Sequence, residues 1–249
     1  MTLRNPKLVD YILTESIDAC DESVNRALKD ALIDIVGCIV AGSQTPIANI
    51  VRTFAYAQWG GGRSSIICSS ERLTSMEAAL ANATMANALD VDDGHRLVKG
   101  HPGAVIFPAV LAAVEDYQAN GKQLLNALLV SYEVGIRAGM VAHHIRPEYH
   151  CTGSWGAIGA AAGAARIIGL SASSIEHALG IAEYHAPYSP MMRCIDYPAM
   201  VKDGIGWGSM TGISSAYLAQ SGFTGIPSLL TMESANDLVN ELGQTYRIS

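Results

Sequence analysis

Apolar residues recur along much of the chain at the spacing of an α-helix, whereas the alternating pattern of a half-buried strand is scarce. The first long helical pattern begins at Ser23, a residue type that caps helix N-termini, and stops at Gly42. Its apolar positions lie on one face, at Ala27, Ala31, Leu32, Ile35, Val36 and Ile39. The pattern predicts a helix with one buried face, in a chain that is nearly all helical.

Two capping-box signatures predict further helix starts, because a Ser or Thr is followed three positions later by Glu. Thr74 and Glu77 precede a helical run that ends near Leu89, and Ser173 and Glu176 precede another. We expect two more helices, over residues 103–119 and from residue 121 toward residue 144. The short turns between them predict an antiparallel multi-helix bundle.

The stretch at 151–165, CTGSWGAIGAAAGAA, differs from the other helical patterns because it consists mostly of small residues. Gly159 and Gly163 lie one helical turn apart among alanines, and each glycine costs a helix about 1 kcal/mol relative to alanine. This free-energy cost implies a compensating contact, in which another helix or a ligand lies very close to the backbone of this helix.

Composition and charge narrow the class of protein. The 249 residues are 49% hydrophobic and 16% charged, as in a soluble globular protein. The 23 acidic residues exceed the 16 basic ones, for a formal charge of −7, and no basic block offsets them. Such a charge repels phosphate backbones, so we expect no nucleic-acid partner.

Cysteine usage and hydropathy predict a cytoplasmic protein. The five cysteines are spread out with no C-x-x-C pair, which disfavours a disulfide framework or a zinc knuckle and fits a reducing compartment. The N-terminus lacks the apolar segment of a signal peptide. The uncharged stretch 204–232 is rich in Gly, Ser and Thr and contains Pro227, so we interpret it as a packed helix and turn rather than a membrane span.

An acidic, imidazole-rich segment provides the first candidate chemistry. Asp90, Asp92 and Asp93 lie within four positions, and His95 and His101 follow. Neighbouring carboxylates repel one another, so a buried member should have a raised pKa, which suits proton transfer near neutral pH. A divalent metal is a second interpretation, although no metal-loop spacing is present, and a solvated turn capped by Asp90 is a third.

Two other segments contain candidate binding groups. His150, Cys151, Thr152 and Gly153 precede or open the Gly/Ala-rich helix, where free backbone N–H groups favour a bound anion such as a substrate carboxylate. Cys151 itself is expected to be a buried spectator. Lys202, an isolated cation before 29 uncharged residues, is either solvated or directed into a cleft where it pairs with a carboxylate.

In this order, the segments resemble the MmgE/PrpD family. The resemblance rests on residues 34–42 (DIVGCIVAG), 88–93 (ALDVDD), 101–102 (HP), 132–134 (YEV), 150–153 (HCTG) and 202–225, which end in GFTG. It implies a helical domain that forms a homodimer and much of the active site, a smaller α/β lid domain, small di- or tricarboxylate substrates, and no metal or organic cofactor.

The resemblance also implies roles for individual residues. By position, the catalytic groups are Asp93, His101, His150 and Lys202. Substrate-binding groups are expected at Asp92, His95, Thr152 and Gly153. Abstraction of a proton next to a carboxylate builds negative charge, which the histidines and the lysine would stabilise.

The expected function is that of a cofactor-independent lyase, a dehydratase acting on a hydroxy di- or tricarboxylate such as 2-methylcitrate. Isomerisation or epimerisation, decarboxylation, and a non-catalytic dimerisation role are the alternatives. Gly94 and Gly103 replace the Thr and Ser common in the methylcitrate branch, and residues 242–249 resemble the junction to the lid domain. We therefore expect residues 1–249 to form the helical domain alone, with the lid absent or contributed by a separate chain.

Overall fold

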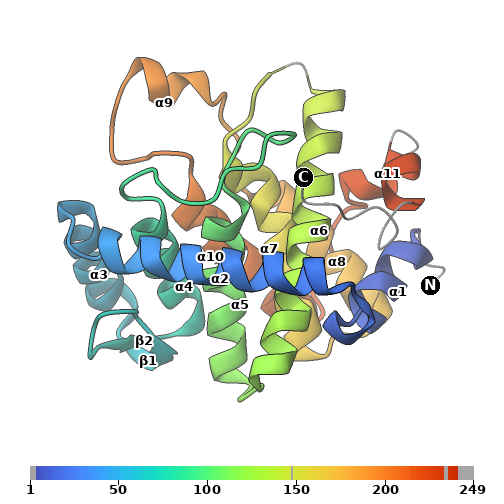
Figure 1. Ribbon diagram of the computed structural model, residues 1–249, viewed down its shortest axis with the longest axis horizontal. Coiled ribbons are helices and arrows are strands. Elements are labelled where there is room, and N and C mark those ends of the chain that lie inside the picture. Colours follow the sequence, from blue (N-terminus) through green and yellow to red (C-terminus); the bar gives the residue numbers. More distant parts are fainter. Residues whose placement is uncertain (1–3, 147, 233–234, 241–249) are drawn as a thin grey trace.

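The protein is all-α, as the sequence predicts. The computed structural model describes residues 4–146, 148–232 and 235–240. Figure 1 shows helices throughout, with one small hairpin at the edge. The α-helices and strands are α1 (Pro6–Thr14), α2 (Glu22–Gly42), α3 (Pro46–Trp59), β1 (Gly61–Ser65), β2 (Arg72–Leu73), α4 (Ser75–Ala86), α5 (Pro102–Asp116), α6 (Gly121–Ile145), α7 (Thr152–Ile168), α8 (Ala172–His185), α9 (Met192–Asp196), α10 (Ile205–Gln220) and α11 (Asn236–Asn240).

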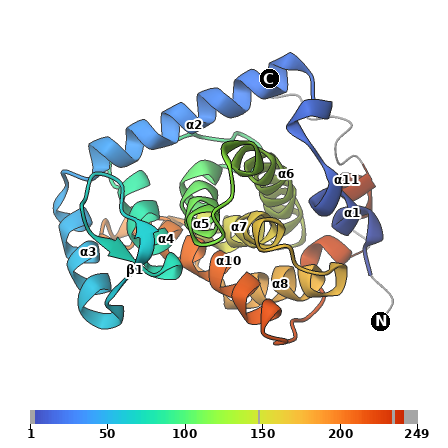
Figure 2. The ribbon, with the colours of Figure 1, turned by 90° about the horizontal axis from the view of Figure 1, so that it is seen from below.

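The Gly/Ala-rich helix α7 is the centre of the bundle. It packs against α5, α6, α8 and α10, which surround it in Figure 2. Every α7 residue from Thr152 to Ala165 is buried, so small side chains on all its faces allow neighbours on all sides. The long helix α2 lies across one side of this bundle and packs mainly on α4.

The close approach predicted for the α7 glycines is a helix–helix contact. A Cβ atom placed on Gly159 would lie 2.5 Å from the Ser131 carbonyl oxygen and 2.8 Å from Cα of Gly135, both on α6. At Gly163 it would lie 2.0 Å from Oγ of Ser131. The two backbones therefore touch, and tight packing rather than a ligand explains these glycines.

The structure moves two of the predicted helix starts. Helix α2 begins at Glu22 with Asp21 as N-cap, two residues before Ser23. Helix α8 is capped by Ser171, whose side chain accepts from the N–H of Ser174. Glu176 makes no capping box, because its carboxylate accepts from the backbone N–H groups of Arg4 and Asn5 at the start of the chain.

The N-cap at Thr74 was predicted correctly, but its hydrogen bonds were not. Helix α4 starts at Ser75 without a side-chain cap, and Thr74 Oγ1 and one Glu77 oxygen are buried without a partner among the described residues. The β1–β2 hairpin was not expected from the sequence, because its strands consist of Gly, Ser, Arg and Leu rather than β-branched residues.

The apolar stretches of the chain form helices that pack inside the protein. The uncharged stretch does form a packed helix, α10, followed by turns. Helix α6 is long and apolar enough to cross a bilayer, but 78% of its most apolar window is buried inside the protein, which is the pattern of a core helix. The bent pair α2–α3 also passes this test of length and composition when taken together. The predicted lid junction at 242–249 lies outside the described residues.

Candidate active site

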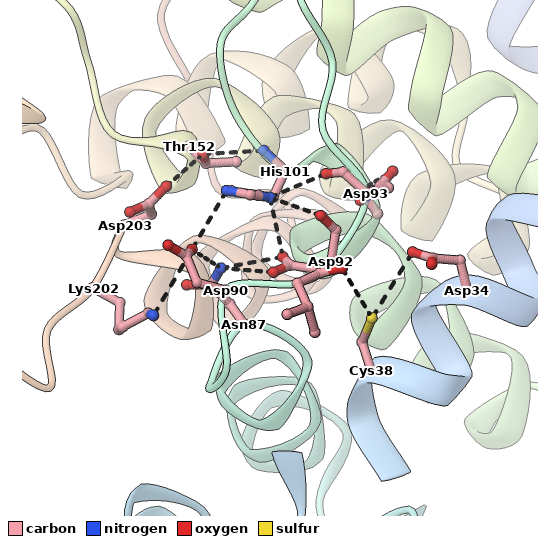
Figure 3. Close-up of polar contacts among 12 residues, drawn as sticks. Asp34, Cys38, Asn87, Asp90, Asp92, Asp93, His101, Thr152, Lys202 and Asp203 are labelled. Carbon is pink, nitrogen blue, oxygen red and sulfur yellow. Dashed lines mark hydrogen bonds and ion pairs between the residues drawn. The ribbon is translucent and has the colours of Figure 1, made fainter. Parts of the chain in front are cut away.

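Two chain segments that are far apart in the sequence form the polar site. The first, residues 87–101, links α4 to α5 and folds back on itself through a bridge between His95 and Gly100. This fold-back places His101, the N-cap of α5, beside the acidic turn that follows α4. The second segment ends with Lys202 and Asp203, just before α10. Figure 3 shows the two segments meeting around the His101 ring.

The imidazole of His101 is held in one orientation. Its Nδ1 atom lies 3.1 Å from the backbone carbonyl oxygens of Asp92 and Asp93. Carbonyl oxygens only accept hydrogen bonds, so Nδ1 carries a proton. The other nitrogen, Nε2, lies 3.6 Å from Oδ1 of Asp90, and it is therefore the atom that can gain or lose a proton.

Asn87, the C-cap of α4, ties the carboxylates together. Its Nδ2 amide donates to Oδ1 of Asp90 at 3.2 Å and to both oxygens of Asp92 at 3.0 and 3.2 Å. Asp92 is buried, and its Oδ2 lies 3.6 Å from Nδ1 of His101. The ring thus has one buried and one exposed carboxylate as neighbours.

Lys202 completes this group from the opposite segment. Its Nζ lies 3.8 Å from Oδ1 of Asp90, the same oxygen that faces Nε2 of His101. Asp90 and Lys202 both have positive φ angles, 59° and 45°, which non-glycine residues rarely adopt. Strained backbone at both partners is typical of a functional site.

Asp203 and Thr152 connect the ring to the start of α7. Thr152 donates from Oγ1 to Oδ2 of Asp203 at 3.2 Å and accepts from the backbone N–H of His101 at 3.3 Å. The Gly153 N–H, predicted to bind a substrate carboxylate, donates instead to the backbone carbonyl of Asp203 at 3.1 Å. A Cβ on Gly153 would lie 2.3 Å from the Gly204 carbonyl oxygen, so this glycine is required by packing.

The surroundings favour a protonated His101. Burial lowers the pKa of the imidazole, but the charge and carbonyl of Asp92, together with Asp203 and Asp90, more than offset it and raise the pKa above its usual value. Burial raises the pKa of Asp92 despite the opposing effects of His101 and Asn87. An imidazolium between carboxylates is an acid that can deliver a proton near neutral pH.

Asp93, the predicted acid–base group, points away from this cluster. Its carboxylate accepts from the Gly103 N–H at 3.0 Å and from the Tyr132 hydroxyl at 3.1 Å, at the start of α5. Burial raises the pKa of Asp93 to about 7, against the lowering effect of the Tyr132 hydrogen bond. A Cβ at Gly103 would lie 2.4 Å from the Tyr132 oxygen and 2.8 Å from an Asp93 oxygen, which explains glycine there.

His150, the fourth predicted catalytic residue, lies in a separate aromatic stack. Its ring centroid is 4.8 Å from that of Tyr188 and 5.9 Å from that of His143. The ring is buried, and neither nitrogen has a hydrogen-bond partner among the described residues. Burial lowers the pKa of His150, which favours the neutral form of the ring.

The structure thus joins two of the four predicted catalytic side chains, His101 and Lys202, through Asp90. His95 belongs to the fold-back: its N–H donates to the Gly100 carbonyl, and its buried Nδ1 has no partner in the described part of the chain. Cys151 is buried, as expected, and its thiol contacts the Pro187 carbonyl. Burial raises the pKa of the thiol.

A metal ion was one interpretation of the acidic segment. One ligand atom from each of Asp90, Asp92 and His101 lies within 4.8 Å of the others. However, the Lys202 ammonium already lies 3.8 Å from Oδ1 of Asp90, so a cation bound by Asp90 would meet a positive charge there. The donor set therefore fits a network of ion pairs better than a metal centre.

Sequence reasoning missed Asn87 and Asp203, and it placed Asp90 in the acidic segment without naming Asp90 among the catalytic or binding residues. Asn87 had a weak signal, since Asn at a helix C-terminus next to an acidic turn can bond the carboxylates that follow it. Asp203 had none beyond its place next to Lys202. Its role depends on the start of α10 lying beside the start of α7, which local sequence does not reveal.

Comparisons with known proteins agree with this architecture. The chain is 28% identical over 214 residues to the cis-aconitate decarboxylase-like protein oryM of Aspergillus oryzae, a match covering 82% of this chain and 44% of that protein. It is 26% identical to the cis-aconitate decarboxylases of Aspergillus terreus and Homo sapiens, with 86% of this chain and 45% of each relative matched. The chain thus spans less than half the length of these relatives.

Residues 6–237 match the MmgE/PrpD N-terminal domain. The match includes helices α1 to α10 and both segments of the polar site. The chain therefore belongs to the MmgE/PrpD family.

Proposed function

We propose that this chain supplies the acid–base group of a cofactor-independent lyase acting on a di- or tricarboxylate. The observation that carries the proposal is the His101 ring, with Nδ1 fixed by two carbonyls and Nε2 free to exchange a proton beside Asp90 and Lys202. When the ring is protonated, the exchangeable proton is on Nε2, which faces the ion pair of Asp90 and Lys202. That arrangement suits a group that protonates a substrate.

Lys202 is the group that binds a substrate carboxylate. Its side chain is partly exposed, and its partner Asp90 is 58% exposed, so their ion pair at 3.8 Å is weak and easily exchanged. A substrate carboxylate can take the place of the Asp90 carboxylate on Nζ. It would then lie next to Nε2 of His101, which approaches the same Asp90 oxygen.

Decarboxylation is the reaction that the relatives' names support. The bond between the substrate carbon and the departing carboxylate breaks, carbon dioxide leaves, and the electron pair passes to the substrate. The imidazolium of His101 then donates its Nε2 proton to the carbon that receives this charge, while Lys202 holds a remaining carboxylate.

Dehydration, which the sequence predicted, would use the same groups differently. It needs a base for the carbon-bound proton and an acid for the departing hydroxyl. A buried carboxylate, Asp92, lies 3.6 Å from the His101 ring, so an acid and a base are adjacent.

We further propose that the protein is cytoplasmic and works as a homodimer, with the site covered by a lid segment or second chain.

The test is an assay of the protein with cis-aconitate and with 2-methylcitrate, following carbon dioxide release and formation of a conjugated alkene separately. Lys202→Gln removes a charged contact and is expected to lower kcat/KM about ten- to hundredfold. Lys29→Gln, on the exposed side of α2, is the matched control and should change nothing. Absence of turnover with every acid tried, or equal activity of the two variants, would contradict the proposal.

A further inference from the structure

Asn87, at the C-terminus of α4, makes contacts that a helix cap does not require. Asparagine is used at helix ends mainly because it tolerates a positive φ. Here the φ angle is −97°, a negative value that non-glycine residues commonly have. The backbone at this position therefore does not call for asparagine. The reason for the residue type lies in its side chain, which is only 2% exposed.

The amide of Asn87 lies between two carboxylates, as Figure 3 shows. Its Nδ2 atom donates to Oδ1 of Asp90 at 3.2 Å and to both oxygens of Asp92 at 3.0 and 3.2 Å. Ionised carboxylates only accept hydrogen bonds, so the amide nitrogen rather than the oxygen must face them. This orientation leaves Oδ1 buried without a hydrogen-bond partner among the described residues. A buried acceptor without a donor lowers stability, so the orientation serves the two carboxylates rather than the fold.

The backbone of Asn87 holds the same acidic turn. Its carbonyl oxygen accepts from the N–H of Asp90 at 3.2 Å, which closes a turn over residues 87–90. Asp90 has its positive φ of 59° in this turn. Backbone and side chain of Asn87 thus both fix Asp90, whose Oδ1 lies 3.6 Å from Nε2 of His101 and 3.8 Å from Nζ of Lys202.

The hydrogen bonds from Asn87 also favour the charged form of the carboxylates beside the ring. Burial raises the pKa of Asp92, and the amide of Asn87 is one of the contacts that oppose this rise. Burial lowers the pKa of His101, and the charge of Asp92 is the largest effect that raises it, with Asp203 and Asp90 adding to it. Asn87 therefore contacts two of the three carboxylates that favour the imidazolium, while Asp203 is held by Thr152.

We propose that Asn87 is a positioning residue for proton transfer at His101. It acts through Asp90 and Asp92, which it keeps ionised and directed at the ring. The inference rests on the proposed function, because the state of the ring matters to a reaction only if the ring exchanges a proton with a substrate. Asn87 transfers no proton itself.

The test is Asn87→Leu, which replaces the amide by an apolar side chain of similar size. The pKa of His101, measured by NMR titration, should fall, because Asp92 loses a donor that keeps it ionised and Asp90 is no longer held toward the ring. A general acid works only while it is protonated, so the decline of kcat with rising pH should move to lower pH. At neutral pH, kcat should fall by up to about 10²-fold. Asn87→Ala removes the same amide without a branched side chain and should give the same changes if the leucine variant does not fold.

Asn82→Leu is the matched control, because Asn82 lies on the same helix and is 1% exposed. Its Nδ2 donates to the carbonyl oxygen of Ser65 at 2.9 Å, and its Oδ1 accepts from the N–H of Ile67 at 3.0 Å. These contacts hold the β1–β2 hairpin and do not reach the His101 cluster. The control variant should lose stability but keep the pKa of His101 and the pH dependence of kcat.

A double variant shows whether Asn87 acts through Asp92. In an Asp92→Asn background, Asn87→Leu should lower the pKa of His101 by less than in the unmodified protein, because one of its two carboxylates is already gone. Shifts that simply add would overturn the inference, as would a His101 pKa that Asn87→Leu leaves unchanged or raises.

The two proposals fail in different ways. Turnover of an acid together with an unchanged His101 pKa in Asn87→Leu would leave the proposed function intact and contradict the role of Asn87. A lower His101 pKa in the variant, without turnover of any acid by the unmodified protein, would support the action of Asn87 on the ring and contradict the lyase.

Discussion

We expect His101→Asn to lower the turnover of the proposed lyase by about 10²- to 10⁴-fold, the usual contribution of a general acid. Asparagine keeps a short polar side chain at the N-cap of α5, and its amide can still donate to the carbonyls of Asp92 and Asp93 that hold Nδ1. What it lacks is the second ring nitrogen that faces Asp90. The loss should therefore appear in kcat, with a much smaller change in KM.

His144→Asn is the matched control, because His144 is exposed at the end of α6. Its kinetics should equal those of the unmodified protein. Circular dichroism and thermal unfolding of both variants establish that they fold. A folded His101→Asn protein with full kcat would show that the proton comes from another group.

Gly159→Ala lowers the free energy of unfolding by about 1–3 kcal/mol, the usual cost of overpacking a close contact. The added methyl carbon would meet backbone atoms of α6, 2.5 Å from the Ser131 carbonyl oxygen and 2.8 Å from Cα of Gly135. Backbone cannot rotate away as a side chain can, so α6 and α7 must separate. The measurement is urea-induced unfolding at equilibrium.

Gly37→Ala makes the same chemical change where nothing lies within 4 Å of the new atom. Gly37 is exposed in the middle of α2, so alanine should raise the free energy of unfolding by up to about 1 kcal/mol through helix propensity. Opposite signs for the two variants are the expected result. Equal effects would mean that the α6–α7 contact is looser than the structure shows.

Much of the fold could be predicted because the residues that a helix buries recur at a regular spacing along the sequence. Of the six α2 positions that the apolar spacing predicted to be buried, Ile35 and Ile39 are buried and the other four are half-buried. The small residues of α7, recognised in the sequence as a sign of close approach, are buried on all sides. Helix starts were less accurate: Ser173 has the residue type of a cap, but Ser171 is the one used. Several serines compete within one turn, and tertiary contacts such as that of Glu176 with the Asn5 N–H decide between them.

The candidate site was predictable in residue type but not in orientation. Three acidic residues within four positions look equivalent in sequence, yet the turn directs Asp93 toward Tyr132 and leaves Asp92 beside His101. The positive φ at Asp90 contributes to that turn, and the residue type alone does not predict this backbone angle. His150 is close to α7 in sequence, but its ring stacks on Tyr188, apart from the His101 cluster.

The pKa of His101 tests the central claim most directly, and NMR titration of the labelled histidines measures it, with His101→Asn used to assign the signal. The account predicts a pKa above the ordinary value of about 6.5. In Asp92→Asn it should fall, because the carboxylate charge that opposes burial is removed. A His101 pKa at or below the ordinary value, or one that Asp92→Asn leaves unchanged, would contradict the assignment of His101 as the proton donor.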